Sequence, residues 1–400
     1  MNADVFAAAL AHVCVSYNVL VVSLALSCAN EVHPYSDIES TMVTSALVGG
    51  SIVGMTFFGW LGDATTRKGA LAWAMFVAFV GAASSAVLSF EPYLYLQLAI
   101  WRLVVGFGCG GLYPLAATIA RESPGATPRT VATTICAQGI GYFFAPVTAY
   151  ALLCLVDSYA VIWRTLLGIG AILLLVPLPL ILRNNGARDS CAQPEAAERK
   201  ARPSLVAALR QRSNWPLLAG TAGCWFLFDI VFYGNTLFED VVLADMFPND
   251  GGVKDTAMEE VITYAIAIWG YFAGFAFMDR LGPRFIQTQG FSIMAILYLL
   301  LWWIYSDTGS SSFLLLVPYA CTYLFSNFGP NVTTFIIPSL TYPMENRASL
   351  NGISAAAGKA GALVGSLAFE PLSSSVGVSG IFFICGLIAA TAAIATVTFV

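Results

Sequence analysis

Charged residues are scarce in this sequence. Asp, Glu, Lys and Arg make up 10% of its 400 residues, and 58% of the residues are hydrophobic, whereas a soluble domain carries about 25% charged residues. A chain with so little charge cannot cover a globular surface with polar groups. The composition therefore excludes an ordinary soluble domain and predicts an integral membrane protein, with the lipid bilayer as its surroundings and no nucleic-acid partner.

Several functional patterns are also lacking. The chain has only two His, and it shows no metal-ligand cluster, no phosphate-binding loop and no set of nucleophile, base and acid, so we predict no metal, no cofactor and no enzyme activity. Its nine Cys do not predict a disulfide framework, because all but Cys191 fall in or beside apolar segments. The first four residues contain no Lys or Arg, and a long apolar run follows, which argues against a cleaved signal peptide.

Long apolar runs are what the sequence has in abundance. About 20 apolar residues are needed for a helix to cross the hydrocarbon core of a membrane. Twelve segments meet this length, and they predict twelve transmembrane helices: residues 5–28, 42–62, 69–90, 94–120, 130–155, 160–182, 215–240, 257–279, 284–306, 311–338, 349–372 and 377–400. The runs are too long and too continuous for the strands of a membrane β-barrel, so the predicted fold class is all-α.

Positive charge is distributed unevenly between the connecting loops. Most of the 18 Lys and Arg residues fall in alternate loops on one side of the predicted membrane, and the other side has only Lys254. Loops rich in Lys and Arg face the cytoplasm, so the bias places both termini inside the cell. This agrees with an even number of helices.

One long basic loop divides the chain into two equal sets of helices. We predict an N-terminal half at residues 1–182, a cytoplasmic linker at 183–214 and a C-terminal half at 215–400. The halves carry similar loops, "GWLGDATTRK" (59–68) and "GFAFMDRLGPR" (274–284). Two six-helix halves with repeated loops are typical of a transporter that rocks about a central site.

The seventh span contains an acid in an apolar stretch, "GTAGCWFLFDIVFYGN" (220–235). Trp225, Asp229 and Tyr233 differ by four positions, so they line one face of a helix. Burial favours the protonated form of a carboxylate, which makes Asp229 a candidate proton carrier. Alternatively, Asp229 is a structural acid that pairs with Lys359 in the eleventh span, and the two readings can coexist.

The fourth span, "WRLVVGFGCGGLYPLAATIARES", holds a charge and a row of glycines. The glycines provide a face for close helix packing, and Pro114 weakens the helix beyond it. Because a bare charge is costly in a membrane, Arg102 needs a partner or a water-filled cavity. The alternative is that Arg102 extends to the interface.

Amides and aromatic residues in other spans complete a candidate pocket. Asn327 and Asn331 share a face of the tenth span, where Pro330 and Pro338 loosen the backbone, and Gln138 lies in the fifth span. Each amide alone could simply join two helices. Together with the aromatic residues of spans four and seven, they predict a polar pocket between the halves.

The loop at 59–68 resembles the signature loop of the major facilitator superfamily, in which an acid and basic residues form a cytoplasmic charge network. Thr66 stands here in place of the turn glycine of the family. The resemblance, the second-half repeat and the charge within span four give our predicted gating residues: Asp63, Arg67, Lys68, Arg102, Asp279, Arg280 and Arg284.

Four longer segments resemble the phosphate:proton symporters of that superfamily. They are the span-seven segment, the span-four segment, "GYFAGFAFMDRLGPRFIQTQGF" and "SNFGPNVTTFIIPSLTYPMENRASLNGISAAAGKAGALVGS". The resemblance implies the major facilitator fold, phosphate and protons as partners, and the plasma membrane as location. It also implies a substrate site formed by Tyr113, Gln138, Trp225, Asp229, Tyr233, Asn331 and Lys359.

The chain departs from this family at positions that are usually acidic. Val15 and Asn18 replace an acid pair in the first span, Leu112 replaces an acid before the span-four tyrosine, and Leu340 replaces an acid after span ten. Coupling could therefore depend on Asp229 alone, or the protein could be a uniporter or exchanger. The pocket could also take a phosphate ester or another small anion, or the protein could sense phosphate without moving it.

Overall fold

The structure, a computed structural model, describes residues 2–183, 209–212, 214–246, 252–308 and 315–400, and these residues form helices without any strand. Most of the expected linker, 183–214, lies outside the described residues. The helices of the first part of the chain are α1 (Ala3–Asn30), α2 (Asp37–Ala64), α3 (Arg67–Val87), α4 (Leu94–Arg121), α5 (Pro128–Cys136), α6 (Gln138–Leu155), α7 (Tyr159–Leu175) and α8 (Leu178–Arg183). Those of the second part are α11 (Asn214–Leu218), η2 (Ala219–Gly223), α12 (Cys224–Met246), α13 (Val253–Leu281), α14 (Pro283–Thr308), α15 (Leu316–Asn327), α16 (Pro330–Thr341), η4 (Met344–Asn346) and α17 (Arg347–Phe399).

Eleven helical segments in the described residues are long and apolar enough to cross a membrane. The twelfth expected span, 311–338, is not one helix, because α15 and α16 have 12 residues each and break apart at Gly329. Gly329 is not helical (φ −154°, ψ −122°), and the ring of Pro330 disfavours a helical conformation in the residue before it. Conversely, α17 contains two spans that bend at Gly377, where φ is 71°, a conformation that favours glycine.

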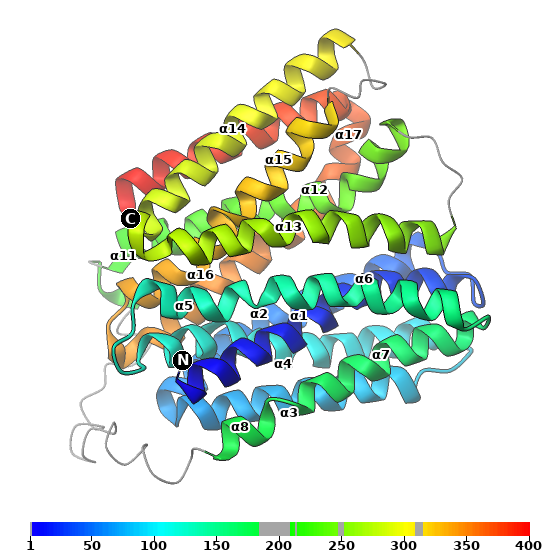
Figure 1. The fold of residues 1–400 in the computed structure, drawn as a ribbon, viewed down its shortest axis with the longest axis horizontal. Helices are drawn as coiled ribbons and strands as arrows, with labels where there is room; N and C mark the ends of the chain where they lie inside the picture. The colour runs from blue at the N-terminus through cyan, green and yellow to red at the C-terminus, as the bar shows by residue number, and fades with distance from the viewer. Residues whose placement is uncertain (1, 184–208, 213, 247–251, 309–314) are drawn as a thin grey trace.

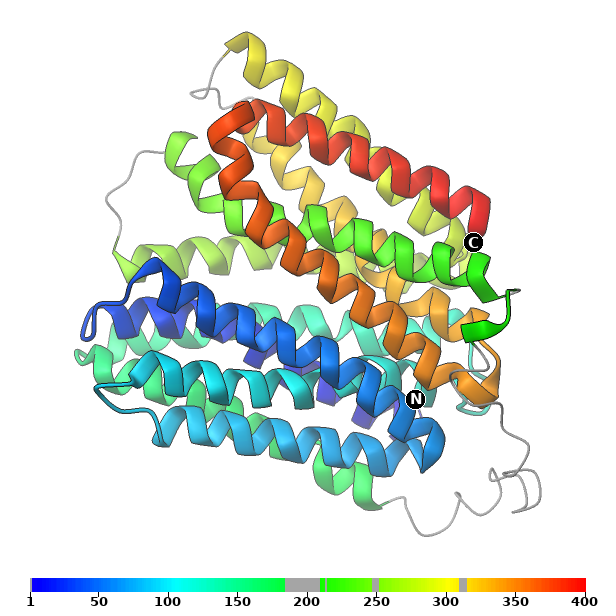
Figure 2. The same cartoon turned by 180° about the vertical axis from the view of Figure 1, so that it is seen from behind.

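The helices form two groups (Figures 1 and 2). Helices α1 to α8 lie together, and α12 to α17 lie beside them. Within the groups α2 packs against α4 and α12 packs against α17, whereas α17 against α2 and α13 against α6 join one group to the other. Both chain ends lie toward the same end of the bundle (Figure 1).

The glycines of α4 allow close packing, as the sequence predicts. A Cβ atom at Gly106 would lie 2.0 Å from the carbonyl oxygen of Leu47, and one at Gly110 would lie 2.4 Å from that of Ser51. Only a residue without a side chain lets the two backbones approach this closely. The α2–α4 contact therefore fixes α4, which carries Tyr113 near the centre of the bundle.

Two spans contain an irregular turn. The fifth span is divided at Ala137 into α5 and α6, so that Gln138 begins α6. In the seventh span the π-turn η2 follows the short helix α11 and lies directly before α12. Such irregular turns often occur at functional sites, and here they precede Gln138 and Trp225.

Candidate functional site

An ion pair in the interior joins α12 and α17. The Lys359 Nζ lies 3.3 Å from Asp229 Oδ2 and donates a hydrogen bond of 2.6 Å to the hydroxyl oxygen of Tyr233. It also lies 4.1 Å from the centre of the Tyr233 ring, close enough for a cation–π contact. One ammonium group thus has a carboxylate, a phenol and an aromatic face as partners.

Both charges are removed from water. Asp229 is 2% exposed, and the side chain of Lys359 is 12% exposed. Separating two buried opposite charges leaves each without compensation in a medium of low dielectric constant, which is strongly unfavourable. The pair therefore stays closed unless another group replaces one of the partners.

The predicted face of the seventh span is present in α12. Trp225 and Asp229 are both buried on it, and the centre of the Trp225 ring lies 6.5 Å from that of Tyr113 on α4. Gly358 leaves room for the indole, because a Cβ there would lie 2.3 Å from Trp225 Cδ1. The indole thus packs directly against the α17 backbone, one residue before Lys359.

Amide and phenol groups form a connected network beside the ion pair. Tyr113 donates to Gln138 Oε1 (3.2 Å), and Gln138 Nε2 donates to the hydroxyl oxygen of Tyr271 (3.1 Å). Asn331 Nδ2 donates to the same oxygen of Tyr271 (2.9 Å) and to Asn327 Oδ1 (2.7 Å). The network crosses from α4 and α6 to α13, α15 and α16, so it joins the two groups of helices.

The ion pair and part of this network line one small pocket. Its lining residues are Tyr113, Ile135, Gln138, Tyr142, Trp225, Asp229, Phe232, Tyr233, Asn331 and Lys359. The structure therefore brings together every residue that we predicted for the substrate site, although their role in binding stays a prediction. The space among them holds little more than a water-sized particle, so a larger ligand requires Lys359 and the tyrosines to move apart.

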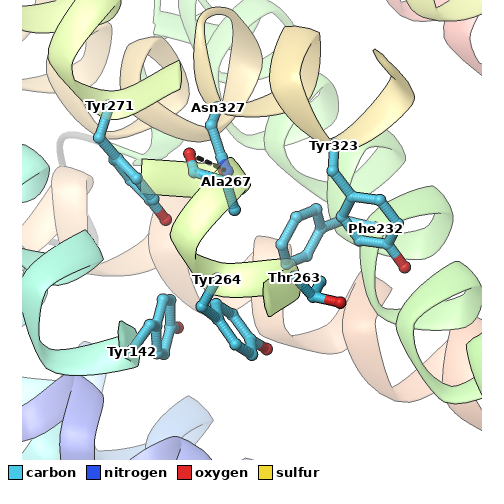
Figure 3. A pocket seen from close by; sticks show the side chains of 8 residues that line it. All are labelled: Tyr142, Phe232, Thr263, Tyr264, Ala267, Tyr271, Tyr323 and Asn327. Carbon is cyan, nitrogen blue, oxygen red and sulfur yellow. Dashed lines mark hydrogen bonds between the residues drawn. The ribbon is translucent and has the colours of Figure 1, made fainter. Parts of the chain in front are cut away.

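A second pocket lies beside the first and shares Tyr142 and Phe232 with it (Figure 3). It is mainly aromatic, and one hydrogen bond, from Asn327 Nδ2 to the carbonyl oxygen of Ala267 (3.2 Å), crosses its wall. Tyr264 belongs to α13 and packs against Tyr142, with 5.8 Å between the ring centres. This pocket extends the site toward the N-terminal end of α13.

Sequence reasoning missed several residues at the site. Tyr271 and Tyr142 line the two pockets but are not among the residues that the sequence predicts for the site. His12 on α1 is 1% exposed, and its ring meets those of Tyr113 and Phe335 edge-on at 5.6 and 5.2 Å. A His within an apolar span is the one signal in the sequence that could have pointed to it.

Three of the positions that are usually acidic in the family carry no charge in this chain and are buried. Val15, Asn18 and Leu112 are each at most 1% exposed. Asn18 Nδ2 donates to the carbonyl oxygens of Cys14 and Gly170, both at 2.9 Å, so it joins α1 to α7. Among the described residues that line the pocket, Asp229 is the only carboxylate.

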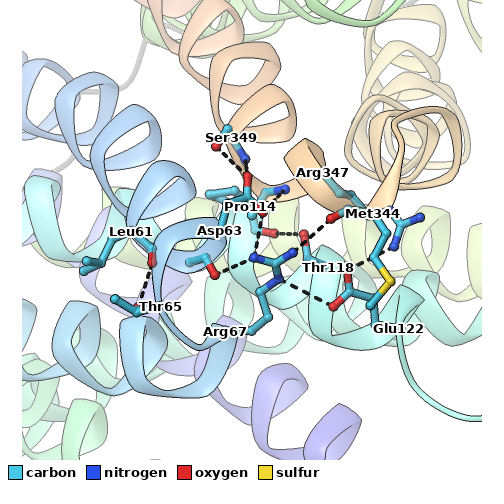
Figure 4. Close-up of polar contacts among 12 residues, drawn as sticks. Leu61, Asp63, Thr65, Arg67, Pro114, Thr118, Glu122, Met344, Arg347 and Ser349 are labelled. Atoms are coloured by element: carbon cyan, nitrogen blue, oxygen red, sulfur yellow. Dashed lines mark hydrogen bonds and ion pairs between the residues drawn. The ribbon is translucent and has the colours of Figure 1, made fainter. Parts of the chain in front are cut away.

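A charge cluster closes one end of the bundle (Figure 4). Asp63 pairs with Arg67 at 2.6 Å and accepts a hydrogen bond of 2.7 Å from the backbone N–H of Ser349 in the first turn of α17. Glu122 at the end of α4 contacts Arg67 (3.5 Å) and Arg347 (3.0 Å). Because Arg67 also donates to the carbonyl oxygen of Met344, the cluster ties the α2–α3 loop to the start of α17.

The second copy of the repeated loop, residues 274–284, makes a similar contact. Asp279 at the end of α13 accepts hydrogen bonds from Thr127 Oγ1 (3.1 Å) and from the backbone N–H of Arg129 (2.9 Å) at the start of α5. Each aspartate therefore caps a helix of the other group, where a negative charge is favourable. Asp63 is 7% exposed, whereas Asp279 lies at the surface.

The other predicted gating residues have different surroundings. Lys68 pairs with Asp4 on α1 at 3.0 Å, Arg280 is exposed, and Arg284 donates to the carbonyl oxygen of Val397 (2.7 Å). Arg102 is 1% exposed and lies outside the charge cluster. Its burial contradicts the alternative in which its side chain extends to the interface.

The arrangement suits binding rather than covalent chemistry. Within the ranges that the structure covers, no group of three or more His, Cys, Asp or Glu side chains is placed to hold a metal. The pocket instead offers one ammonium group, several hydrogen-bond donors and one carboxylate. Such a set can bind an anion and exchange a proton.

Comparison with known proteins gives consistent results. The profile of the Major Facilitator Superfamily matches residues 6–337. The chain is 31% identical to Inorganic phosphate transporter PT2 of Toxoplasma gondii over 394 residues, which cover 95% of this chain and 69% of the relative. It is 32% identical to Probable inorganic phosphate transporter 1-3 of Oryza sativa subsp. japonica, over 82% of this chain and 74% of the relative.

Solved structures with the same fold include a proton:xylose symporter, XylE, bound to 6-bromo-6-deoxy-D-glucose, with a TM-score of 0.78 and 18% identity over 98% of this chain and 94% of that one. Another is the transporter FucP in an outward conformation, with a TM-score of 0.73 and 14% identity over 99% of each chain. These likenesses concern the fold alone. The profile, the two broad sequence matches and the fold show that this chain belongs to the major facilitator superfamily and, within it, to the family of the inorganic phosphate transporters.

Proposed function

We propose that the protein is a secondary transporter that moves inorganic phosphate across a membrane by alternating access. The observation that carries the proposal is the buried ion pair of Lys359 and Asp229 within a pocket of phenol, indole and amide donors. Residues 1–182 and 215–400 are the two units that rock, with 183–214 as their linker. The names of the relatives support phosphate as the substrate.

The chemistry of the pocket fits a tetrahedral oxyanion. Phosphate oxygens favour N–H and O–H donors together with a cation. Lys359 supplies the cation, Tyr113 and Tyr233 supply hydroxyls, and Gln138 and Asn331 supply amide N–H groups. In the state described here Lys359 is held by Asp229 and Tyr233, so phosphate would take over the ammonium group from these partners.

Asp229 then gives a route for proton coupling. A protonated Asp229 is neutral and can donate to a phosphate oxygen, whereas an ionised Asp229 repels the anion and recaptures Lys359. Binding of phosphate and of a proton therefore favour each other, which is the requirement for a symporter. Because Asp229 is the only carboxylate among the described residues that line the pocket, coupling depends on it.

The charge cluster supports an orientation for the transport cycle. Loops with an excess of Lys and Arg face the cytoplasm, and the cluster at Arg67 and Arg347 belongs to that side. We therefore place the end closed by Asp63 and Asp279 in the cytoplasm together with both termini. The plasma membrane is the location that the family resemblance implies. Opening of this end has to break both aspartate caps.

The proposed function is tested by uptake of radiolabelled phosphate into proteoliposomes that contain the purified protein. Uptake that increases with an inward proton gradient supports a proton-coupled symporter. Uptake that is indifferent to the gradient identifies a facilitator or exchanger. Absence of phosphate uptake, with retained uptake of a glycerophosphodiester, overturns inorganic phosphate as the substrate.

Asp63→Asn is expected to open the cytoplasmic end. The carboxylate accepts charge-assisted hydrogen bonds from Arg67 and the α17 backbone, and such bonds contribute about 1.5–3 kcal/mol each. Loss of one shifts the equilibrium between closed and open states roughly tenfold or more. Distances between spin labels at Ala64 and Glu345, both exposed, measure the shift. Lys68→Gln removes a charge from the same loop outside this contact, and an equal effect of both substitutions would refute the assignment.

Gly358→Ala is expected to reduce phosphate uptake at least about tenfold, because the new methyl group would lie 2.3 Å from Trp225 Cδ1 and displace the indole from the pocket. Gly168→Ala is the matched control, since a Cβ there meets nothing within 4 Å. The measurement is the ratio of uptake to protein incorporated in the liposomes. Similar losses of uptake in the two variants would mean that replacing a helical glycine by alanine, and not the position of the indole, is responsible.

A further inference from the structure

Arg102 is a buried charge that the proposed transport site does not use. It lies on α4 and is 1% exposed. Its Nε donates to Ser85 Oγ at 3.1 Å, but Nη1 and Nη2 have no hydrogen-bond partner among the described residues. A guanidinium stays protonated at any physiological pH, and leaving its N–H groups unsatisfied inside a membrane protein is costly.

A second unsatisfied donor lies at the same place. Trp163 on α7 is 1% exposed, and its Nε1 also lacks a partner in the described part of the chain. Arg102 and Trp163 line one small cavity together with apolar residues of α1, α2, α4 and α7, which are Val22, Ala25, Leu26, Ala29, Val43, Leu98 and Leu167. Arg102 and Trp163 together carry three donor nitrogen atoms without a partner and one positive charge, and the cavity lining includes no carboxylate.

The cavity is separate from the pocket around Lys359. The two share no lining residue. Ala29 lies near the end of α1, and Leu98 lies one turn after the start of α4, so the cavity is nearer the end of the bundle opposite the charge cluster. It has room for about one water-sized particle, which is too little for phosphate but sufficient for a monatomic anion.

We propose that this cavity binds a halide ion, with chloride as the physiological ligand. Arg102 Nη1 and Nη2 would supply charge-assisted hydrogen bonds, and Trp163 Nε1 would supply a further donor. The apolar walls lower the local dielectric constant and so strengthen the attraction between the ion and the guanidinium. A water molecule satisfies donors but cannot neutralise the charge, which is the reason to prefer an anion. Binding stabilises the packing of α1, α4 and α7 around the cavity.

The test is thermal unfolding of the full-length protein in detergent, with sodium chloride exchanged for sodium gluconate at constant ionic strength. Chloride is expected to raise the unfolding midpoint to a plateau by roughly 2 °C or more. Bromide should act similarly, whereas sulfate, which is too large for the cavity, should give no shift that reaches a plateau. Because Arg102 stays charged, the shift should be the same at pH 5.5 and pH 8. A shift that keeps growing with salt, or that appears equally in gluconate, overturns the proposal.

Variants separate this site from other effects. Arg102→Gln should abolish the chloride-dependent rise of the unfolding midpoint. Trp163→Phe keeps the packing and should reduce that rise severalfold, so it tests the site even if Arg102→Gln fails to fold. Arg210→Gln removes an exposed arginine and should leave the shift unchanged. A full chloride shift in both cavity variants would refute the site.

The proposal does not depend on phosphate transport, and one further variant makes the two independently testable. Lys359→Ala should lose stabilisation by phosphate but retain that by chloride. If instead the chloride shift disappears in Lys359→Ala and persists in Arg102→Gln, chloride binds in the central pocket and the halide cavity is wrong. Absence of phosphate uptake by the wild-type protein, with an intact chloride shift, would count against the transport function alone.

Discussion

Lys359→Ala is expected to abolish phosphate uptake in proteoliposomes. The lysine is the one cation among the residues that line the central pocket, and no other described group there can compensate an anion. Removing one member of a buried charge pair costs about 2–5 kcal/mol, and every 1.4 kcal/mol corresponds to a factor of ten. Uptake should therefore fall at least about 30-fold.

Two variants show whether the loss comes from the anion site itself. Lys254→Ala removes a lysine near the ring of Tyr150 (5.7 Å), away from the pocket, and should transport normally. The double variant Lys359→Ala with Asp229→Asn removes the carboxylate that the first change leaves unpaired. If the double variant recovers stability but not uptake, Lys359 acts on the anion. Normal uptake by Lys359→Ala would refute the proposed role of the pocket in anion binding.

Asp229→Asn is expected to separate phosphate movement from the proton gradient. The amide has the shape of a protonated carboxyl and stays neutral at every pH, so the variant should still bind and exchange phosphate. Net uptake by the wild type should decrease as the external pH rises and Asp229 loses its proton. Between about pH 5 and pH 8 the variant should lose the part of the pH dependence that comes from Asp229 and keep only that of phosphate's own ionisation, with no accumulation driven by the gradient.

The control for this experiment is Asp229→Glu, which keeps a titrating group at the end of a longer side chain. It should retain pH dependence even if its rate is lower. Counterflow of labelled against unlabelled phosphate measures exchange without net proton movement. A pH profile in Asp229→Asn identical to that of the wild type would exclude Asp229 as the proton carrier and direct attention to His12, which contacts Tyr113.

The fold could be predicted from the sequence because a bilayer imposes simple rules. Length and hydropathy are read along the chain, and both agree with the eleven long apolar helices of the described residues. The predictions were less accurate where a single residue changes the backbone. Gly329 and Pro330 divide one expected span into α15 and α16, and hydropathy alone is insensitive to such a break.

The site was predictable where its residues share one helix or a known motif. Trp225, Asp229 and Tyr233 follow from a four-residue spacing, and Lys359 follows from its charge. Tyr271 could not be assigned in this way. Its hydroxyl accepts hydrogen bonds from Gln138 and Asn331, residues from two other helices, and no periodicity within α13 contains that information. Resemblance to a family supplied part of what spacing could not.

The two aspartate caps differ in their surroundings, and this difference implies an order of events. Asp63 is shielded from water and held by Arg67, whereas Asp279 lies at the surface, where water competes for the same hydrogen bonds and weakens them. The contact between α13 and α5 at Asp279 should therefore break before the contact between α2 and α17 at Asp63. The two groups of helices would then separate first on the α5–α13 side and tilt about the α2–α17 side, where the contact persists longest.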